Sequence, residues 1–108
     1  MNLLFLCNQG ENRSRTAKEL FQGKVLHELR SAGFYSESCP ATLETLEWAD
    51  AIVVFEEVHV EKLKQEHPEI WFEKRIINLD ILDVYNYQQE ELKGLLESKM
   101  EEWWGLFE

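Results

Sequence analysis

The sequence predicts a three-layer α/β domain with a four-stranded parallel sheet. Three observations indicate this class. Short segments with strand character recur at residues 3–7, 27–31, 51–55 and 75–79. Segments with helical spacing separate them, and such crossovers join parallel strands. The chain has 108 residues and no repeat or disordered linker, so we expect one domain over residues 1–108 with its own core.

The first strand and the helix after it follow from the apolar pattern. Leu3 to Leu6 form an uninterrupted apolar run that ends in Cys7. A short run of this kind is typical of a strand buried on both faces. A loop over residues 8–12 follows, and we expect a helix from Arg13 to about residue 22, ended by Gly23.

The later elements follow from caps and breakers. Thr42 is expected to cap a short helix that ends at Trp48. A helix over residues 58–65 should end at His67-Pro68, and residues 69–74 are interpreted as a connection. A final helix over residues 88–106 carries an apolar stripe that we assign to the core, made of Leu92, Leu95, Leu96, Met100, Trp103 and Phe107.

The loop between the first strand and the first helix is suited to bind an oxyanion. Successive backbone N–H groups and the positive end of the helix dipole face one concavity there. Arg13 can add a planar two-pronged donor, and Ser14 can donate its hydroxyl to the sulfur of Cys7. The same field favours the thiolate of Cys7, which we expect at the rim of the loop, although a cysteine that ends a buried strand can also be an inert small hydrophobe.

These residues resemble a known family. Cys-x5-Arg-Ser over residues 7–14 resembles the phosphate loop of the low-molecular-weight protein tyrosine phosphatases, especially their small bacterial members. The likeness continues in residues 31–33 (Ser-Ala-Gly), 48–55, and Asp83-Val84-Tyr85, where the family carries Asp-Pro-Tyr. The resemblance implies the family's α/β fold and phosphomonoester hydrolysis, in particular of phosphotyrosine, through a phosphocysteine, without metal or cofactor.

The resemblance also implies roles for single residues. Cys7 would be the nucleophile, Arg13 with the loop amides would stabilise the transferred phosphoryl group, and Asp83 would be the general acid, with Asp80 as the competing candidate. Tyr85 would flank the substrate, although packing in its loop is an equal alternative. The expected substrate contacts are Asn8, Gln9, Gly10, Glu11, Asn12, Ser14 and Tyr85.

Several positions depart from the family pattern. Gly10 stands where the family usually has Asn, Asn12 where it often has Cys, and Arg15 where it has Pro. Glu11 adds a carboxylate that repels a dianion unless it turns outward. These departures suggest a non-catalytic phosphate- or phosphoprotein-binding regulatory module as an alternative. A thiol-dependent arsenate reductase would need resolving cysteines near the fourth strand, and no cysteine follows Cys39.

Composition restricts the partners. The net charge is −10, from 21 acidic and 11 basic residues, which argues against nucleic acid. We expect a phosphorylated protein or a small aryl phosphate as substrate, and no membrane partner. No secretory signal is visible at the start, so we expect a cytoplasmic protein with reduced cysteines. Glu56, Glu57 and His59 lack zinc-type spacing and are interpreted as a solvated helix start.

Overall fold

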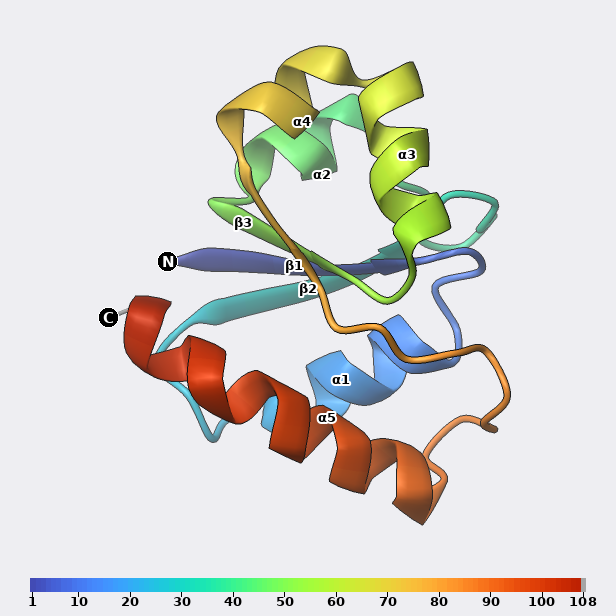
Figure 1. The fold of residues 1–108 in the computed structure, drawn as a ribbon, viewed down its shortest axis with the longest axis vertical. Coiled ribbons are helices and arrows are strands. Elements are labelled where there is room, and N and C mark those ends of the chain that lie inside the picture. The colour runs from blue at the N-terminus through green and yellow to red at the C-terminus, as the bar shows by residue number, and fades with distance from the viewer. Residues whose placement is uncertain (108) are drawn as a thin grey trace.

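The computed structural model describes residues 1–107 and shows three layers, a central sheet with helices on both faces (Figure 1). The elements follow the predicted alternation of strands and helices. In chain order they are β1 (Asn2–Cys7), α1 (Arg13–Phe21), β2 (Glu28–Gly33), α2 (Leu43–Trp48), β3 (Ala51–Val54), α3 (Glu57–Glu66), α4 (Pro68–Glu73), β4 (Arg75–Asn78), α5 (Glu90–Trp104) and the 3-10 turn η1 (Gly105–Phe107).

The sheet has four parallel strands in the order β2-β1-β3-β4, which confirms the predicted fold class. The chain runs from β1 outward to β2, then returns across β1 to β3 and β4. The strand order therefore reverses between β1 and β3, where Leu4 pairs with Ile52. Ligands of open parallel sheets bind beyond the carboxyl ends of the strands at such a point.

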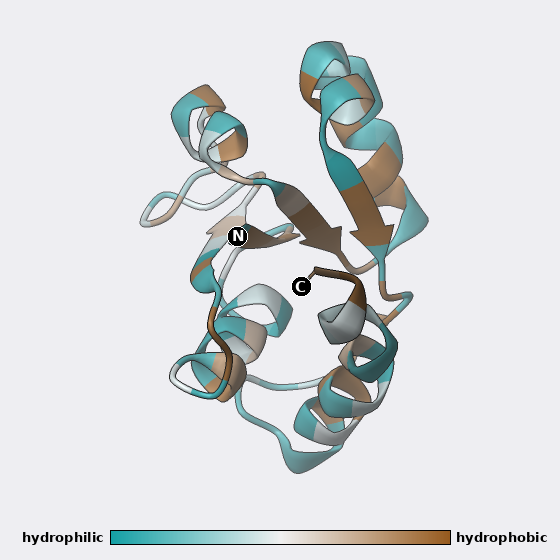
Figure 2. Cartoon of the chain, turned by 90° about the vertical axis from the view of Figure 1, so that its left-hand side faces the viewer, coloured by the Kyte–Doolittle hydropathy of each residue, from teal (hydrophilic) through white to brown (hydrophobic). Residues whose placement is uncertain are grey.

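Alternate residues of β1 face the two helical layers. Leu3 and Phe5 belong to a core cluster shared with α1, α5 and η1, which we call the α1/α5 cluster. Leu4 and Leu6 belong to a second cluster with α2, α3 and α4. All four side chains are fully buried, which explains the uninterrupted apolar run. Figure 2 shows the apolar strands between helices whose outer surfaces are hydrophilic.

Two predictions about elements are corrected. Residues 69–73, which we interpreted as part of a connection, lie in α4 (Pro68–Glu73), because Pro68 at its first turn begins this helix as well as ending α3. β2 runs from Glu28 to Gly33 rather than from residue 27 to 31. The apolar stripe of the last helix lies in the α1/α5 cluster as predicted, with Leu92, Leu96 and Met100 fully buried. No helix within residues 1–107 is long and apolar enough to span a bilayer.

Candidate active site

The loop over residues 8–12 joins β1 to α1 beyond the carboxyl end of β1. Gly10 has a φ of 72°, a backbone conformation that favours glycine. Gly33 at the end of β2 lies directly against the loop, since a Cβ added there would come within 2.3 Å of Gln9 C. Phe34 N donates to Cys7 O (3.0 Å) and Tyr35 N to Asn8 O (2.7 Å). The chain after β2 therefore holds the loop in place.

Two hydrogen-bonding groups converge on the sulfur of Cys7. Gly10 N donates to Sγ at 3.3 Å, and Ser14 Oγ lies 3.1 Å from Sγ. Cys7 is only 3% exposed and belongs to the α1/α5 cluster. We expected the thiol at the rim of the loop, and this is wrong. The strand continues buried to its last residue, so the sulfur lies at the base of the loop.

The amino end of α1 has no cap. Asn12 precedes the helix without a capping hydrogen bond from its side chain, and no acidic residue lies in the first turn. Within residues 1–107, the first backbone N–H of this helix with an acceptor is that of Thr16, which donates to Asn12 O (2.9 Å). N–H groups without acceptors at a helix start, together with the helix dipole, favour an anion at this position.

Arg13 is the most buried charged side chain near the loop, at 1% exposure. Its Nη1 donates to Glu56 Oε2 and to Ile81 O, both at 2.8 Å. Its Nε has no acceptor among residues 1–107 and lies 3.8 Å from Asp83 Oδ1. One nitrogen of the guanidinium is thus held by the protein, while Nε keeps an unused N–H.

The loop after β4 brings Asp83 to this arginine. Ile81 N donates to Phe55 O (2.8 Å), which continues the pairing of β4 with β3 beyond the strand ends. The side chain of Asp83 is 49% exposed. Asp80 is exposed, has a φ of 58°, and its carbonyl accepts from Lys99 (3.3 Å). Of the two candidate acids, Asp83 is therefore the one next to Arg13.

The same loop is tied to α1 through Glu19. This carboxylate accepts hydrogen bonds from the Tyr87 hydroxyl, from Gln88 Nε2 (2.8 Å) and from Arg15 Nε (3.1 Å). The bond from Tyr87, followed by those from Arg15 and Gln88, lowers the pKa of Glu19 below its usual range. Tyr85 is half-buried against the α1/α5 cluster, so its predicted contact with a substrate stays a prediction.

Two functional candidates, Glu56 and His59, were misjudged from the sequence. His59 is fully buried rather than solvated, and its Nδ1 accepts from Phe55 N and Glu56 N, both at 3.2 Å. Burial, with a smaller contribution from Arg13, lowers the pKa of His59 to about 4. The sequence signal was present but unused: Glu56 precedes α3 just beyond the central strand β3, and His59 lies in the first turn of α3, at the sheet's carboxyl edge.

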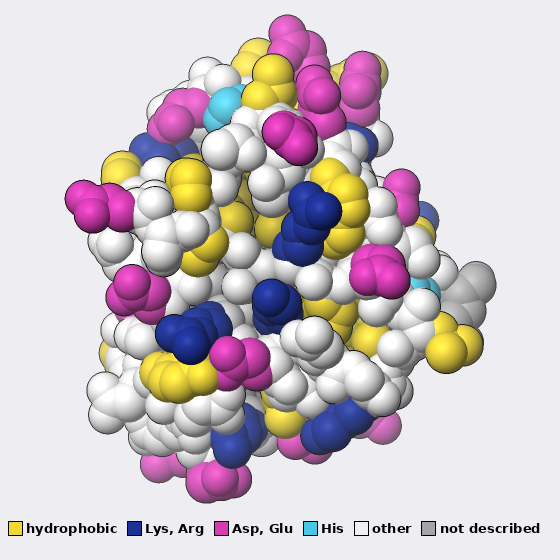
Figure 3. Space-filling view, turned by 180° about the vertical axis from the view of Figure 1, so that it is seen from behind, with side chains coloured by type: hydrophobic (Ala, Val, Ile, Leu, Met, Phe, Trp, Pro, Cys, Tyr) yellow, Lys and Arg dark blue, Asp and Glu magenta, His cyan; other side chains and the backbone are white. Residues whose placement is uncertain are grey.

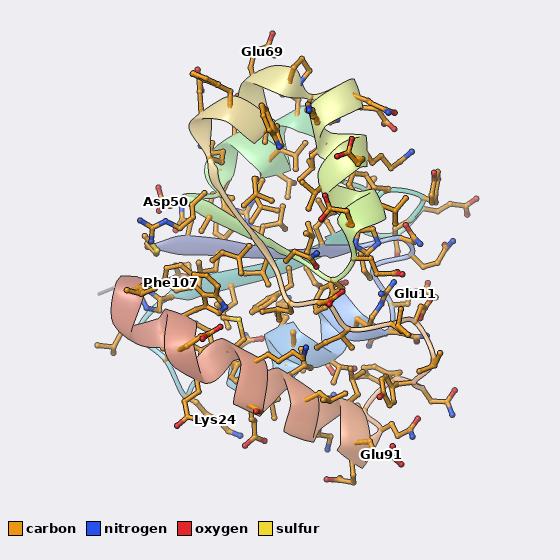
Figure 4. The ribbon with its side chains drawn as sticks, in the orientation of Figure 1. Glu11, Lys24, Asp50, Glu69, Glu91 and Phe107 are labelled. Carbon is orange, nitrogen blue, oxygen red and sulfur yellow. The ribbon has the colours of Figure 1, made fainter. Side chains whose placement is uncertain are left out.

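Two cavities flank the loop. One, of about 290 Å³, is lined by residues that include Gly10, Lys18 and Cys39; the other, of about 330 Å³, by residues that include Gln9 and Tyr35. Glu11 lines both cavities, and Cys7 lines neither. Glu11 is exposed and lies at the end of the molecule opposite Asp50 (Figure 4).

Charge is mixed on one face of the molecule. Basic and acidic side chains are interspersed over the face seen in Figure 3, so the net charge of −10 is not a uniform negative field. Arg15 stacks on the ring of Tyr87 at 4.7 Å, and Lys62 on that of Tyr35 at 4.5 Å. Cys7 and Cys39 are both free thiols, and Cys39 Sγ lies 3.7 Å from Gly10 O.

Comparisons with known proteins place this geometry in a fold family. No family model and no curated protein matches the chain. Among solved structures, the YwlE arginine phosphatase, in a variant with a phosphorylated active-site serine, is 17% identical with a TM-score of 0.84, over 99% of this chain and 95% of that one. The tyrosine phosphatase Wzb from Escherichia coli K30, in complex with phosphate, is 20% identical with a TM-score of 0.73, over 99% and 98%.

A third solved structure carries the family's name. The low-molecular-weight protein tyrosine phosphatase from Bacillus subtilis is 18% identical with a TM-score of 0.75, over 94% of this chain and 98% of that one. Each likeness extends over nearly the whole length of both chains. The chain therefore has the fold of the low-molecular-weight protein tyrosine phosphatases, as the motif in residues 7–14 predicted.

Proposed function

We propose that this protein is a phosphomonoester hydrolase that acts on phosphotyrosine in proteins or on small aryl phosphates. The observation that carries the proposal is the buried Arg13. Its Nη1 is held by Glu56 and Ile81, and its Nε lacks an acceptor within residues 1–107. A buried donor without a partner is costly, and a phosphoryl oxygen supplies the acceptor.

In the first step, the thiolate of Cys7 attacks phosphorus. A sulfur–phosphorus bond forms, the ester oxygen–phosphorus bond breaks, and the proton on Asp83 goes to the departing oxygen. Arg13 Nε and the N–H groups of the loop over residues 8–12 stabilise the charge on the transferred phosphoryl group. Gly10 N and Ser14 Oγ hold the sulfur anion before attack.

In the second step, water attacks the phosphocysteine. As the water oxygen bonds to phosphorus, Asp83, now a carboxylate, takes one proton from the water. The sulfur–phosphorus bond breaks, and inorganic phosphate and the Cys7 thiolate are released. The side chain of Asp83 is 49% exposed and lies beside Arg13, so water can reach it. One carboxyl group then serves both steps.

A phosphoarginine substrate is a second candidate. The likeness to the YwlE arginine phosphatase, which has the TM-score of 0.84, favours it. The chemistry at Cys7 would be the same, with a nitrogen–phosphorus bond broken in place of the ester bond and a guanidine as leaving group. Release rates of phosphate from matched phosphotyrosine and phosphoarginine peptides decide between the two substrate classes.

The hydrolysis of an aryl phosphate tests the proposal. We expect Cys7→Ser to abolish turnover, because the nucleophile is lost. Asp83→Asn should reduce kcat by about 10²- to 10⁴-fold for a poor leaving group and much less for a good one, since only the former needs a proton. Asp80→Asn is the matched control and should retain activity, because Asp80 lies apart from Arg13.

The opposite result identifies the alternative from a different class. If wild type, Cys7→Ser and Asp83→Asn all show the same trivial rate, the hydrolase proposal is wrong. If wild type then still binds inorganic phosphate, and Arg13→Ala does not, the chain is a phosphate-binding module without turnover. The exposed carboxylate of Glu11 and the 3% exposure of Cys7 are the observations that favour that alternative.

A further inference from the structure

We propose that Glu56 is a positioning residue for Arg13 and that His59 holds Glu56 in place. This inference rests on the proposed phosphate chemistry and adds two residues to it. The salt bridge between Arg13 Nη1 and Glu56 Oε2 is 2.8 Å long and joins residues 43 positions apart. Neither Glu56 nor His59 contacts the predicted nucleophile, so they act through Arg13.

The geometry fixes the plane of the guanidinium. Nη1 is shared between Glu56 Oε2 and Ile81 O, two acceptors from different elements, and the Phe55 ring lies 5.7 Å from the central carbon of the guanidinium. Two acceptors on one nitrogen restrict rotation of the side chain more than one would. The Nε side is therefore left facing Asp83 Oδ1 at 3.8 Å.

His59 fixes the turn that carries Glu56. Its Nδ1 accepts from two successive backbone N–H groups, those of Phe55 and Glu56. An acceptor Nδ1 leaves the ring proton of the neutral imidazole on Nε2. That Nε2 is buried and has no hydrogen-bond partner within residues 1–107. It lies 3.9 Å from Glu56 Oε2, the same oxygen that forms the salt bridge with Arg13.

The placement also disfavours a competing hydrogen bond. Asp83 Oδ1 lies within ion-pair distance of Arg13 Nε at 3.8 Å, but Nε donates no hydrogen bond to it. Such a bond would occupy the nitrogen needed by phosphate and the carboxylate proposed as general acid. Glu56 holds Arg13 through Nη1, which restricts the turn of the guanidinium that would bring Nε into hydrogen-bond contact with Asp83. Loss of this contact should weaken phosphate binding and turnover together.

Binding of inorganic phosphate to wild type and three variants, measured by calorimetry, separates positioning from countercharge. Glu56→Gln keeps an acceptor oxygen at the same reach, so its phosphate affinity should stay within about threefold of wild type or become tighter. Glu56→Ala loses the acceptor and should bind phosphate about tenfold or more weakly. Glu56→Asp keeps the charge with a shorter reach and should also weaken binding.

Glu57→Gln is the matched control, because it removes the same charge at the next position and Glu57 is exposed. The circular dichroism of each variant's aromatic residues, at the temperature of the titration, shows that the fold is retained. Equal affinities for Glu56→Ala and Glu56→Gln, or wild-type affinity for Glu56→Asp, would overturn the positioning role and leave a purely electrostatic or structural one.

The two proposals fail in different ways. If wild type binds phosphate but hydrolyses no aryl phosphate, the hydrolase proposal fails, and the ranking of the Glu56 variants by phosphate affinity still decides the role of Glu56. If wild type turns over through Cys7 and the Glu56 variants show the kcat and KM of the Glu57→Gln control, only the positioning role fails. A wild type that binds no phosphate overturns both.

Discussion

The buried His59 makes the stability of this protein depend on pH below neutrality. Burial lowers its pKa to about 4 in the folded state, and Arg13 acts in the same direction against the opposing carboxylates of Glu56 and Asp83. An unfolded histidine has a pKa of about 6.5. Between these values the unfolded chain binds more protons than the folded one, so stability falls as the pH falls through this window.

The structure sets the magnitude of this effect. Each pH unit below 6.5 costs about 1.4 kcal/mol of unfolding free energy until the folded pKa is reached. The loss from His59 alone should be about 2 kcal/mol at pH 5 and about 3 kcal/mol at pH 4. Well above pH 6.5 the residue is neutral in both states and contributes no pH dependence.

Urea unfolding, followed by the fluorescence of the four tryptophans, measures this loss between pH 8 and pH 4.5. His59→Asn is the control, because its side-chain oxygen can accept from Phe55 N and Glu56 N without titrating. The wild type should lose about 2 kcal/mol more than the variant between pH 7 and pH 5. Parallel pH profiles for the two proteins would refute the claim that His59 is buried in its neutral form.

Three further predictions concern the loop and its supports. Gly33→Ala should destabilise the fold by at least about 1–3 kcal/mol and abolish phosphate binding, because the added Cβ would lie 2.3 Å from Gln9 C. Thermal unfolding measures the first effect, and phosphate titration measures the second. Gly94→Ala, a helical position with nothing within 4 Å, is the matched control and should raise stability by about 0.5–1 kcal/mol. Glu11→Gln should tighten phosphate binding about two- to fivefold at low salt and less at high salt; unchanged or weaker binding at low salt would place this carboxylate away from the anion. Tyr87→Phe removes a hydrogen bond to Glu19 and should lower unfolding free energy by about 0.5–1.5 kcal/mol in urea titrations, whereas an unchanged midpoint would mean that this bond does not hold the loop.

Local patterns were sufficient for the fold and for the centre of the candidate site. The uninterrupted apolar run at β1 predicted a strand buried on both faces, and Thr42 caps α2 as expected, accepting from Thr45 N at 3.2 Å. The loop over residues 8–12 with Cys7 and Arg13 was recognised because its residues are contiguous. Signals of this kind come from neighbours in the chain, and they survive folding unchanged.

Sequence reasoning failed where one residue could serve two purposes. Pro68 was interpreted only as the end of a helix, although proline also suits the first turn of the next one, and α4 begins there. Cys7 was expected at a rim, but the buried strand continues through it to 3% exposure. In both cases the local sequence permits two outcomes, and packing selects one.

The sequence by itself determined the alternation of strands and helices, the parallel sheet and a loop suited to an oxyanion, because periodicity and turn chemistry act over a few residues. Only the tertiary structure decided that Glu56 and Ile81 hold Arg13, that Asp83 rather than Asp80 lies beside it, and that His59 is buried. These contacts join chain segments that are distant in sequence. They meet because all four strands are parallel, so their carboxyl ends lie at one edge of the sheet, and the strand order reverses between β1 and β3 at that edge.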